Sequence, residues 1–464
     1  MNSIITKTDS YKLNHWNQYP ENTEVVYSYF ESRKGARFEK TPFFGLQYIL
    51  MKYLQGVVVT QEAIDFADRL SVSHFGDRGY FNKAGWQYIL DNCGGKLPLR
   101  IKAVPEGTPV TVSNVLMTVE NTDEKCGWLT NYVESLLTHV WYTSTVCALS
   151  RTTKQMYKEY LNESSDNGDA CINFMLHDFG YRGTSSDESA KVGGMAHLVN
   201  FLGTDTVVSM EAAMEYYNAD MNGLAYSVAA TEHSVMTARG RDGEAGILDQ
   251  LLLNYPKGIL SVVSDSYDIY NFVENLVCKQ FKDRIEKRDG VFVVRPDSNT
   301  PKHPNPEDQV VWILQTLANA FGYTTNTKGY MVLNPKVRVI WGDGIDMAGI
   351  DKIIEAAINH SFSAENLLFG MGGGLLQKVN RDTNRYAFKC AAQKRNGQWH
   401  DVYKEPKDLS KVSKKGRMKL IKENGEFKTV RIEDDGEDLL KVVFENGELV
   451  NPITFAEARE NAKV

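Results

Sequence analysis

The feature of this sequence that most constrains its fold is a series of short apolar segments, beginning near residue 170, that alternate with amphipathic helical patterns. In the pattern over 306–321, Val310, Ile313, Leu314 and Leu317 recur at helical spacing. Alternation of strands and helices predicts a parallel sheet. Because about six or seven such units follow one another within roughly 200 residues, the pattern favours a closed (β/α) barrel.

The expected elements can be placed by their residue types. The expected strands are 172–176, 198–202, 224–228, 259–263, 291–294, 337–341 and 366–369. The expected helices lie near 186–200, 206–218, 268–287, 306–321 and 346–360.

The two ends of the chain have a different pattern. The segment 24–30 (EVVYSYF) reads as a strand, and 109–119 as one or two more. Asn424-Gly425 and Asn446-Gly447 separate strand-like runs, which is the signal of a two-residue hairpin. Neither end is self-sufficient, so we expect them to pack together. The predicted parts are an N-terminal α+β segment (1–168), a barrel-like catalytic domain (169–384) and a β-rich C-terminal segment (385–464).

Composition narrows the class of protein. The length of 464 residues suits one barrel and a second domain. A net charge of −7 argues against a general nucleic-acid binder. The N-terminal residues lack the apolar core of a signal peptide, and no apolar run approaches the length of a membrane span. Six scattered cysteines without a C-x-x-C pair suit a reducing compartment. We therefore expect a cytoplasmic protein that binds neither nucleic acid nor membrane.

Polar residues follow each expected barrel strand. They include His177–Gly183, Asp205, Glu232, His233, Asp265, Arg295, Asp297, Asp343 and Gly370–Gly374. One such residue alone is an ordinary turn or helix-cap residue. Seven strand ends with the same feature instead indicate an active site, because barrel enzymes build theirs at the carboxyl ends of the strands.

The residue types suggest a phosphorylated sugar as ligand. The glycine run 370–374 (GMGGG) offers backbone N–H groups to a phosphate. Carboxylates that could bind ribose hydroxyls or Mg²⁺ are Asp265, Asp297 and Asp343. Arginines that could pair with phosphate oxygens are Arg182, Arg295 and Arg381.

At these residues the sequence resembles the nicotinamide phosphoribosyltransferases, a type II phosphoribosyltransferase family. The resemblance runs from Thr8 to about Ala462, nearly the whole chain. It is carried by TDSYK (8–12), LHDFGYRG (176–183), AHLVNFLGTDT (196–206), EHS (232–234), SVVSDSYDIYN (261–271), RPDS (295–298), GDG (342–344), GGGLLQK (372–378) and SKKGR (413–417).

The resemblance implies a pentosyltransferase of NAD salvage. Such an enzyme forms nicotinamide mononucleotide and pyrophosphate from nicotinamide and 5-phosphoribosyl 1-pyrophosphate, and couples the reaction to ATP hydrolysis. The implied fold is a (β/α) barrel-like phosphoribosyltransferase domain with an antiparallel α+β domain formed by the two terminal segments. The implied assembly is a homodimer with active sites at the interface.

For the base, the resemblance implies a site built from aromatic and polar side chains. Phe179 would stack on one face of the pyridine ring and Tyr11 of the partner subunit on the other. Asp205 would accept a hydrogen bond from the carboxamide and repel nicotinate. Ser261 and Arg295 would lie near the amide group.

The resemblance also implies which residues bind the ribose and the phosphates: Arg182, Asp297, Gly342, Asp343, Gly372, Gly373 and Arg381. Arg33, Lys389, Lys404 and Lys411 would contribute across the dimer. The implied catalytic residues are His233, which ATP phosphorylates, Asp265, which orients it, and Asp297. Mg²⁺ would be held mainly by substrate phosphates. The chain departs from the family pattern at Asn299, Trp341 and Met371.

Three alternatives stay open on the sequence alone. A nicotinate phosphoribosyltransferase would share the architecture, and Asp205 argues against it because an anion there disfavours an anionic base. A non-catalytic signalling protein on the same scaffold would not need His233 and Asp297. A glycosidase-like barrel with paired carboxylates would explain the aspartates but not the arginines or the glycine run.

Overall fold

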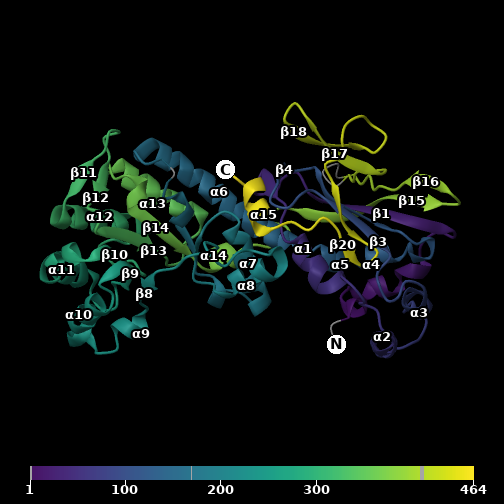
Figure 1. Ribbon diagram of the computed structural model, residues 1–464, viewed down its shortest axis with the longest axis horizontal. Coiled ribbons are helices and arrows are strands. Elements are labelled where there is room, and N and C mark those ends of the chain that lie inside the picture. The colour runs from purple at the N-terminus through teal and green to yellow at the C-terminus, as the bar shows by residue number, and fades with distance from the viewer. Residues whose placement is uncertain (1–2, 169, 408–411) are drawn as a thin grey trace. The chain divides into compact units, whose positions relative to one another are not determined.

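The protein is described by a computed structural model that covers residues 3–168, 170–407 and 412–464. The chain divides into two compact units (Figure 1). The first consists of Met1–Ala148, Ala212–Ala219 and Asn380–Lys463. The second consists of Leu149–Glu211, Asp220–Val379 and Val464.

The second unit is built on a barrel of parallel strands. These are β6 (Leu176–Asp178), β7 (Gly203–Thr204), β8 (Ala229–Ala230), β9 (Lys257–Val263), β10 (Asp289–Arg295), β13 (Val337–Trp341) and β14 (Leu367–Met371). Their order in the sheet is β7-β6-β14-β13-β10-β9-β8, and all pairs are parallel. A parallel bridge between Gly203 and Tyr226 joins β7 to the residues just before β8. The sheet therefore curls until its edges meet, and the predicted barrel-like fold is confirmed.

Helices lie around these strands (Figure 1). They include α7 (Asp187–Leu198), α8 (Val208–Tyr217), α9 (His233–Met236), α10 (Glu244–Asn254), α11 (Lys282–Lys287), α12 (Pro306–Phe321), α13 (Met347–Asn359) and α14 (Gly373–Leu376). In α12 the predicted apolar stripe is fully buried, with Val310, Ile313 and Leu317 all inaccessible to solvent. Pro306 opens this helix, where its fixed φ and missing N–H cost nothing. The helical spacing thus identified a core face.

Four predicted elements are placed differently. The strand expected over 224–228 is not formed, apart from a bridge at Tyr226, and β8 begins only at Ala229. Residues Ile172–Phe174 form a 3-10 turn, and β6 begins only at Leu176. The segment 198–202 is not a strand, because Leu198 ends α7 and β7 begins at Gly203. The helix expected over 268–287 is divided into a π-helical segment, Asn271–Gln280, and α11. The run 198–202 is mostly buried, whereas Phe174 in the run 172–176 is exposed. Apolar runs this short have no periodicity that separates a strand from a turn.

The first unit contains an antiparallel sheet of strands from both ends of the chain. Its order is β16-β15-β1-β5-β3-β19-β20. The strands are β1 (Thr23–Ser32), β3 (Leu99–Ala103), β5 (Val115–Asn121), β15 (Tyr386–Arg395), β16 (Gln398–Asp401), β19 (Lys441–Glu445) and β20 (Glu448–Leu449). Since β1 pairs with β15 and β3 with β19, the terminal segments form one α+β domain, as predicted.

Both predicted hairpins are present in this unit. Asn424-Gly425 joins β17 (Met418–Glu423) to β18 (Glu426–Arg431), and Asn446-Gly447 joins β19 to β20. Further elements are β2 (Lys40–Pro42), β4 (Pro109–Thr111), α1 (Leu46–Ile49), α2 (Gln61–Phe75), α3 (Lys83–Asn92), α4 (Leu129–Tyr132), α5 (Glu134–Leu137) and α15 (Phe455–Asn461). Helix α6 spans Val140–Ser164, and the hairpin β11 (Tyr323–Thr325)–β12 (Met331–Leu333) belongs to the second unit.

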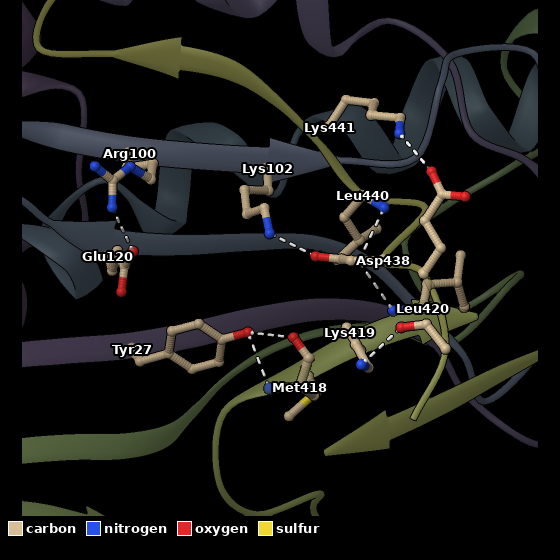
Figure 2. Close-up of polar contacts among 12 residues, drawn as sticks. Tyr27, Arg100, Lys102, Glu120, Met418, Lys419, Leu420, Asp438, Leu440 and Lys441 are labelled. Atoms are coloured by element: carbon tan, nitrogen blue, oxygen red, sulfur yellow. Dashed lines mark hydrogen bonds and ion pairs between the residues drawn. The ribbon is translucent and has the colours of Figure 1, made fainter. Parts of the chain in front are cut away.

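Side-chain contacts fasten the C-terminal strands to the N-terminal ones (Figure 2). The carboxylate of Asp438 pairs with Lys102 of β3, and its Oδ1 accepts from the backbone N–H of Leu440 at 3.0 Å. The hydroxyl of Tyr27 in β1 donates to the carbonyl of Met418 at 2.9 Å. The Lys102–Asp438 and Tyr27–Met418 contacts join segments more than 300 residues apart in the chain. Among the helices that the structure describes, none is both long and apolar enough to cross a membrane.

Candidate active site

A cavity of about 950 Å³ opens at the carboxyl ends of the barrel strands. Most of the predicted site residues of this unit line it: Phe179, Arg182, Asp205, His233, Arg295, Asp297, Gly342, Asp343, Gly372 and Gly373. They come from six different strand ends, as expected when parallel strands bring their C-terminal residues to one face.

A second cavity, of about 370 Å³, lies among the barrel strands. Phe179, Asp205 and Arg295 line both cavities, so the two adjoin at these residues. Ser261, another predicted site residue, lines the smaller cavity. Apolar side chains such as Ile259 and Val293 account for much of its wall. A flat, weakly polar ring would suit the place where the cavities adjoin.

The ring of Phe179 is held from several directions. Its backbone N–H donates to the carbonyl of Met371 at 3.0 Å, and the guanidinium of Arg295 lies 5.0 Å from the ring centroid. The ring also packs directly against Gly370, where an added Cβ would come within 1.9 Å of Phe179 Cε2. Glycine at 370 is therefore required by the close approach of this aromatic ring to β14.

Hydrogen-bonding groups converge beside Phe179. Asp205 contributes a carboxylate, whose Oδ1 accepts from Ser227 at 2.5 Å. The hydroxyl of Ser261 and the Nε of Arg295 are buried and have no hydrogen-bond partner among the residues that the structure describes. Buried polar atoms without partners are rare in folded proteins. The site thus offers one acceptor and two unused donor groups, the complement of a carboxamide.

A buried carboxyl group lies beneath this cluster. Asp178, at the end of β6, is inaccessible to solvent, and its Oδ1 accepts from the backbone N–H of Gly180 at 2.7 Å. Its carbonyl accepts from the N–H of Asp205 at 2.9 Å. Burial raises the pKa of Asp178 to about 7, and the nearby charge of Asp205 acts in the same direction. Asp178 therefore connects the loops that carry Phe179 and Asp205.

The imidazole of His233 lies between two carboxylates. Its Nε2 is 3.0 Å from Asp265 Oδ1, and its Nδ1 is 3.9 Å from Asp297 Oδ2. Asp265 is held in turn by a hydrogen bond from Ser298. A donor Nε2–H leaves a lone pair on Nδ1, which makes that nitrogen the available nucleophile or metal ligand.

Carboxylates and a guanidinium gather beside the histidine. Partial burial, together with the charges of Asp297 and Asp265, raises the pKa of Asp343. Arg295 lies 3.6 Å from Asp297 and offsets part of this negative charge. Within 3–168, 170–407 and 412–464, no three His, Cys, Asp or Glu side chains are arranged to hold a metal ion.

Some residues of the cavity were not assigned a role from sequence. Lys378 lines it and lies in the GGGLLQK motif, which could have identified it. Glu232 forms an exposed ion pair of 3.9 Å with Arg182. Trp341, where the chain departs from the family pattern, donates from Nε1 to the carbonyl of Asp343 at 2.9 Å and so braces that loop.

The predicted residues Tyr11, Arg33, Arg381, Lys389 and Lys404 belong to the first unit. Tyr11 is 55% exposed, unusual for an aromatic side chain. Burial lowers the pKa of Lys389; the charges of Lys404, Arg33 and Arg381 act in the same direction, and that of Glu134 opposes it. These four cations therefore form one basic cluster, although they are widely spaced in sequence. Lys411 lies outside the described residues.

Comparison with known proteins places these features in a family. Residues 174–448 match the model of the nicotinate phosphoribosyltransferase (NAPRTase) family. The chain belongs to the nicotinate phosphoribosyltransferase family. Residues 3–101 also match the N-terminal domain of nicotinamide phosphoribosyltransferase.

Relatives of this family member cover most or all of its length. A protein of Xanthomonas campestris pv. campestris (strain 8004), named nicotinamide phosphoribosyltransferase, is 42% identical over 100% of this chain and 98% of its own. A Mycoplasma pneumoniae (strain ATCC 29342 / M129 / Subtype 1) protein with the same name is 33% identical over 88% of this chain and 94% of its own.

Two solved structures share the fold of this chain. The nicotinate-nucleotide pyrophosphorylase from Pyrococcus furiosus matches with a TM-score of 0.61 at 16% identity, over 99% of this chain and 94% of that one. Human nicotinic acid phosphoribosyltransferase matches with a TM-score of 0.58 at 14% identity, over 98% and 92% of the two chains. At these identities the likeness concerns the architecture alone.

Proposed function

We propose that this enzyme is a nicotinamide phosphoribosyltransferase, which transfers the phosphoribosyl group of 5-phosphoribosyl 1-pyrophosphate to nicotinamide. The products are nicotinamide mononucleotide and pyrophosphate, and the reaction is a salvage step of NAD synthesis. The full-length relatives that carry this name support the assignment. The observation that carries it is the position of Asp205 beside the unpartnered groups of Ser261 and Arg295.

This arrangement distinguishes an amide from an acid. The carboxamide NH₂ donates to Asp205, and the carboxamide oxygen accepts from Ser261 and Arg295, directly or through water. Nicotinate would place a carboxylate against that of Asp205, and like charges in contact disfavour binding. Phe179, with Arg295 nearby, supplies a flat surface for the pyridine ring.

The remaining part of the larger cavity suits the sugar and its phosphates. Asp297 and Asp343 are positioned to bind ribose hydroxyls, and Arg182 to pair with phosphate oxygens. The glycines at 372 and 373 leave backbone N–H groups accessible to the ligand, and an added Cβ at 373 would meet no atom within 4 Å. A bound Mg²⁺ would neutralise charge on the pyrophosphate, with Asp297 and Asp343 as the carboxylates able to contact it directly or through water.

The chemical step needs little acid–base assistance. The pyridine nitrogen of nicotinamide uses its lone pair to form a bond to C1 of the ribose, while the bond from C1 to the pyrophosphate oxygen breaks and its electron pair leaves with pyrophosphate. Positive charge develops on the ring and the sugar in the transition state. Asp297 and Asp343 stabilise that charge, and Phe179 and Asp205 hold the nitrogen in line with C1.

We propose that ATP drives the equilibrium through His233. With Nε2–H donated to Asp265, Nδ1 carries the lone pair that attacks the γ-phosphorus, and ADP leaves. Hydrolysis of the phosphohistidine then returns the imidazole. Because Asp297 lies beside Nδ1, the phosphorylated histidine would be coupled electrostatically to the carboxylates that contact the sugar.

We also propose a cytoplasmic homodimer in which the first unit of one subunit completes the site of the other. The exposed ring of Tyr11 and the basic cluster of Arg33, Arg381, Lys389 and Lys404 support this assembly, because both features lack an obvious role within their own unit. Lys411 would join that cluster, by resemblance alone. The six free cysteines agree with a reducing compartment.

The test is a product assay with the purified protein. Phosphoribosyl pyrophosphate and Mg²⁺ are supplied with nicotinamide or nicotinate, each with and without ATP, and the nucleotide is identified by mass. We expect nicotinamide mononucleotide as the preferred product, and stimulation by ATP. Preference for nicotinate would instead assign the activity named in the family model, and would overturn the role of Asp205.

A further inference from the structure

Asp205, which would bind the carboxamide of the base, also has a hydrogen-bond partner within the protein. Ser227 Oγ donates to Oδ1 of Asp205 at 2.5 Å, across 22 residues of sequence. Both residues are exposed, and both line the smaller cavity. An exposed aspartate without such a partner would sample several rotamers, so the contact selects one orientation.

The backbone around this pair is fixed by the closure of the barrel. Thr204 N–H donates to the carbonyl of Tyr226 at 3.0 Å, and Tyr226 N–H donates to the carbonyl of Leu202 at 2.7 Å. Asp205 and Ser227 are the next residues along these two segments, and they contact each other through their side chains. The backbone pairing therefore places the serine hydroxyl opposite the carboxylate.

The Ser227 hydroxyl leaves one oxygen of the Asp205 carboxylate available for the substrate. A serine carries one hydrogen to donate, and Oδ1 of Asp205 receives it. Oδ2 remains available as an acceptor. Since Asp205 also lines the larger cavity whereas Ser227 lines the smaller one, the serine engages the carboxylate from the side of the smaller cavity. The oxygen left over is then presented to the base.

We propose that Ser227 is the positioning residue that sets the discrimination between nicotinamide and nicotinate, by holding Asp205 with one oxygen toward the carboxamide. This inference rests on the proposed function. Without the serine, Asp205 can turn away from the base. The hydrogen bond to nicotinamide is then weakened and, equally, the repulsion of nicotinate is relieved.

The experiment measures kcat/KM for both bases, at saturating phosphoribosyl pyrophosphate, in wild type and three variants. For Ser227→Ala we expect a loss of about 10- to 100-fold with nicotinamide, mainly through KM, as for a lost hydrogen bond to a charged group. The nicotinamide-to-nicotinate ratio should fall by at least about tenfold. Ser227→Thr keeps the hydroxyl and should retain the ratio within about threefold, whereas Ser227→Val has the same shape without the hydroxyl and should behave like alanine.

Thr327→Val is the matched control. Thr327 Oγ1 donates to Asp166 Oδ1 at 2.6 Å, a hydroxyl–carboxylate contact of similar length between two residues that line neither cavity. It should leave the ratio unchanged. An unchanged ratio in Ser227→Ala, equal losses with both bases, or identical behaviour of the Thr and Val variants would each overturn the inference. Wild type that prefers nicotinate would refute the proposed function instead, so the two failures are distinguishable.

Discussion

His233 and Asp265 form a hydrogen-bonded pair at the edge of the large cavity, with Nε2 of the imidazole 3.0 Å from Oδ1 of the carboxylate. The side chain of Asp265 is only 6% exposed, whereas that of His233 is 48% exposed. A shielded carboxylate therefore orients an accessible histidine. This geometry suits a histidine that accepts a group from a ligand and later releases it.

The first prediction concerns this pair. His233→Ala should keep basal phosphoribosyl transfer but lose its stimulation by ATP, because the acceptor nitrogen is gone. Asp265→Asn should lower the rate of enzyme phosphorylation about 10²-fold, the lower range for loss of a positioned acid–base group. The measurement is acid-labile incorporation of γ-labelled phosphate, together with product formation. His360→Ala is the control, because His360 is an exposed histidine on another surface that contacts a backbone carbonyl. Full ATP stimulation of His233→Ala would contradict the role given to His233.

The second prediction uses the contact of Phe179 with β14. Gly370→Ala should raise KM for nicotinamide about tenfold or more, since the new methyl group would occupy the space of the aromatic ring. Steady-state kinetics with each substrate varied in turn would test this, and KM for phosphoribosyl pyrophosphate should change less. Gly246→Ala is a suitable control, because the added Cβ there meets only a flexible arginine tip at 3.3 Å. Equal effects of the two substitutions on nicotinamide would show that Phe179 does not depend on Gly370.

The third prediction concerns the basic cluster of the first unit. Lys389→Met should lower kcat/KM for phosphoribosyl pyrophosphate about 10- to 100-fold, as for loss of one charged phosphate contact. KM for nicotinamide should stay within about twofold. Because burial and the neighbouring cations together disfavour the charge of Lys389 more than Glu134 favours it, its removal should not destabilise the fold, and the midpoint of thermal unfolding should hold or rise. Lys428→Met, which removes an exposed lysine of the β17–β18 hairpin, provides the comparison.

Sequence reasoning located the elements that carry strong local signals. The helix expected near 306–321 matches α12, because its apolar residues recur at helical spacing. The strand expected over 337–341 matches β13, which is a short apolar run. Strands β7 and β8 have two residues each, too few for any periodicity. They form by pairing with β6 and β9, which are tertiary contacts.

The residues of the site likewise divide into those with a local sequence signal and those without one. The spacing of motifs identified His233, Asp297 and the glycine run, which the structure brings to one cavity. Ser227 and Asp178 carry no such signal, because a serine in a loop and an aspartate after a strand are common turn residues. Their roles depend on which loops the closed barrel brings together. Individual polar partners of this kind are visible only in three dimensions.

The last prediction follows from the buried carboxyl group of Asp178. Its pKa is about 7 in the folded protein and about 4 in an unfolded chain, so the folded state binds the proton more tightly. Asp178 then favours folding most at low pH, and that contribution is lost as pH rises through 7. Asp178→Asn stays neutral and keeps an acceptor for Gly180. Relative to wild type, the asparagine variant should gain stability between pH 5 and 8, by an amount on the order of 2–4 kcal/mol. Unfolding midpoints of both proteins across this range would measure the difference. Burial also raises the pKa of Glu244 to about 7. Both proteins contain Glu244, so its contribution cancels from the difference in stability. A difference that does not change with pH would contradict the prediction, because it would mean that Asp178 is ionised throughout this range in the folded protein as well.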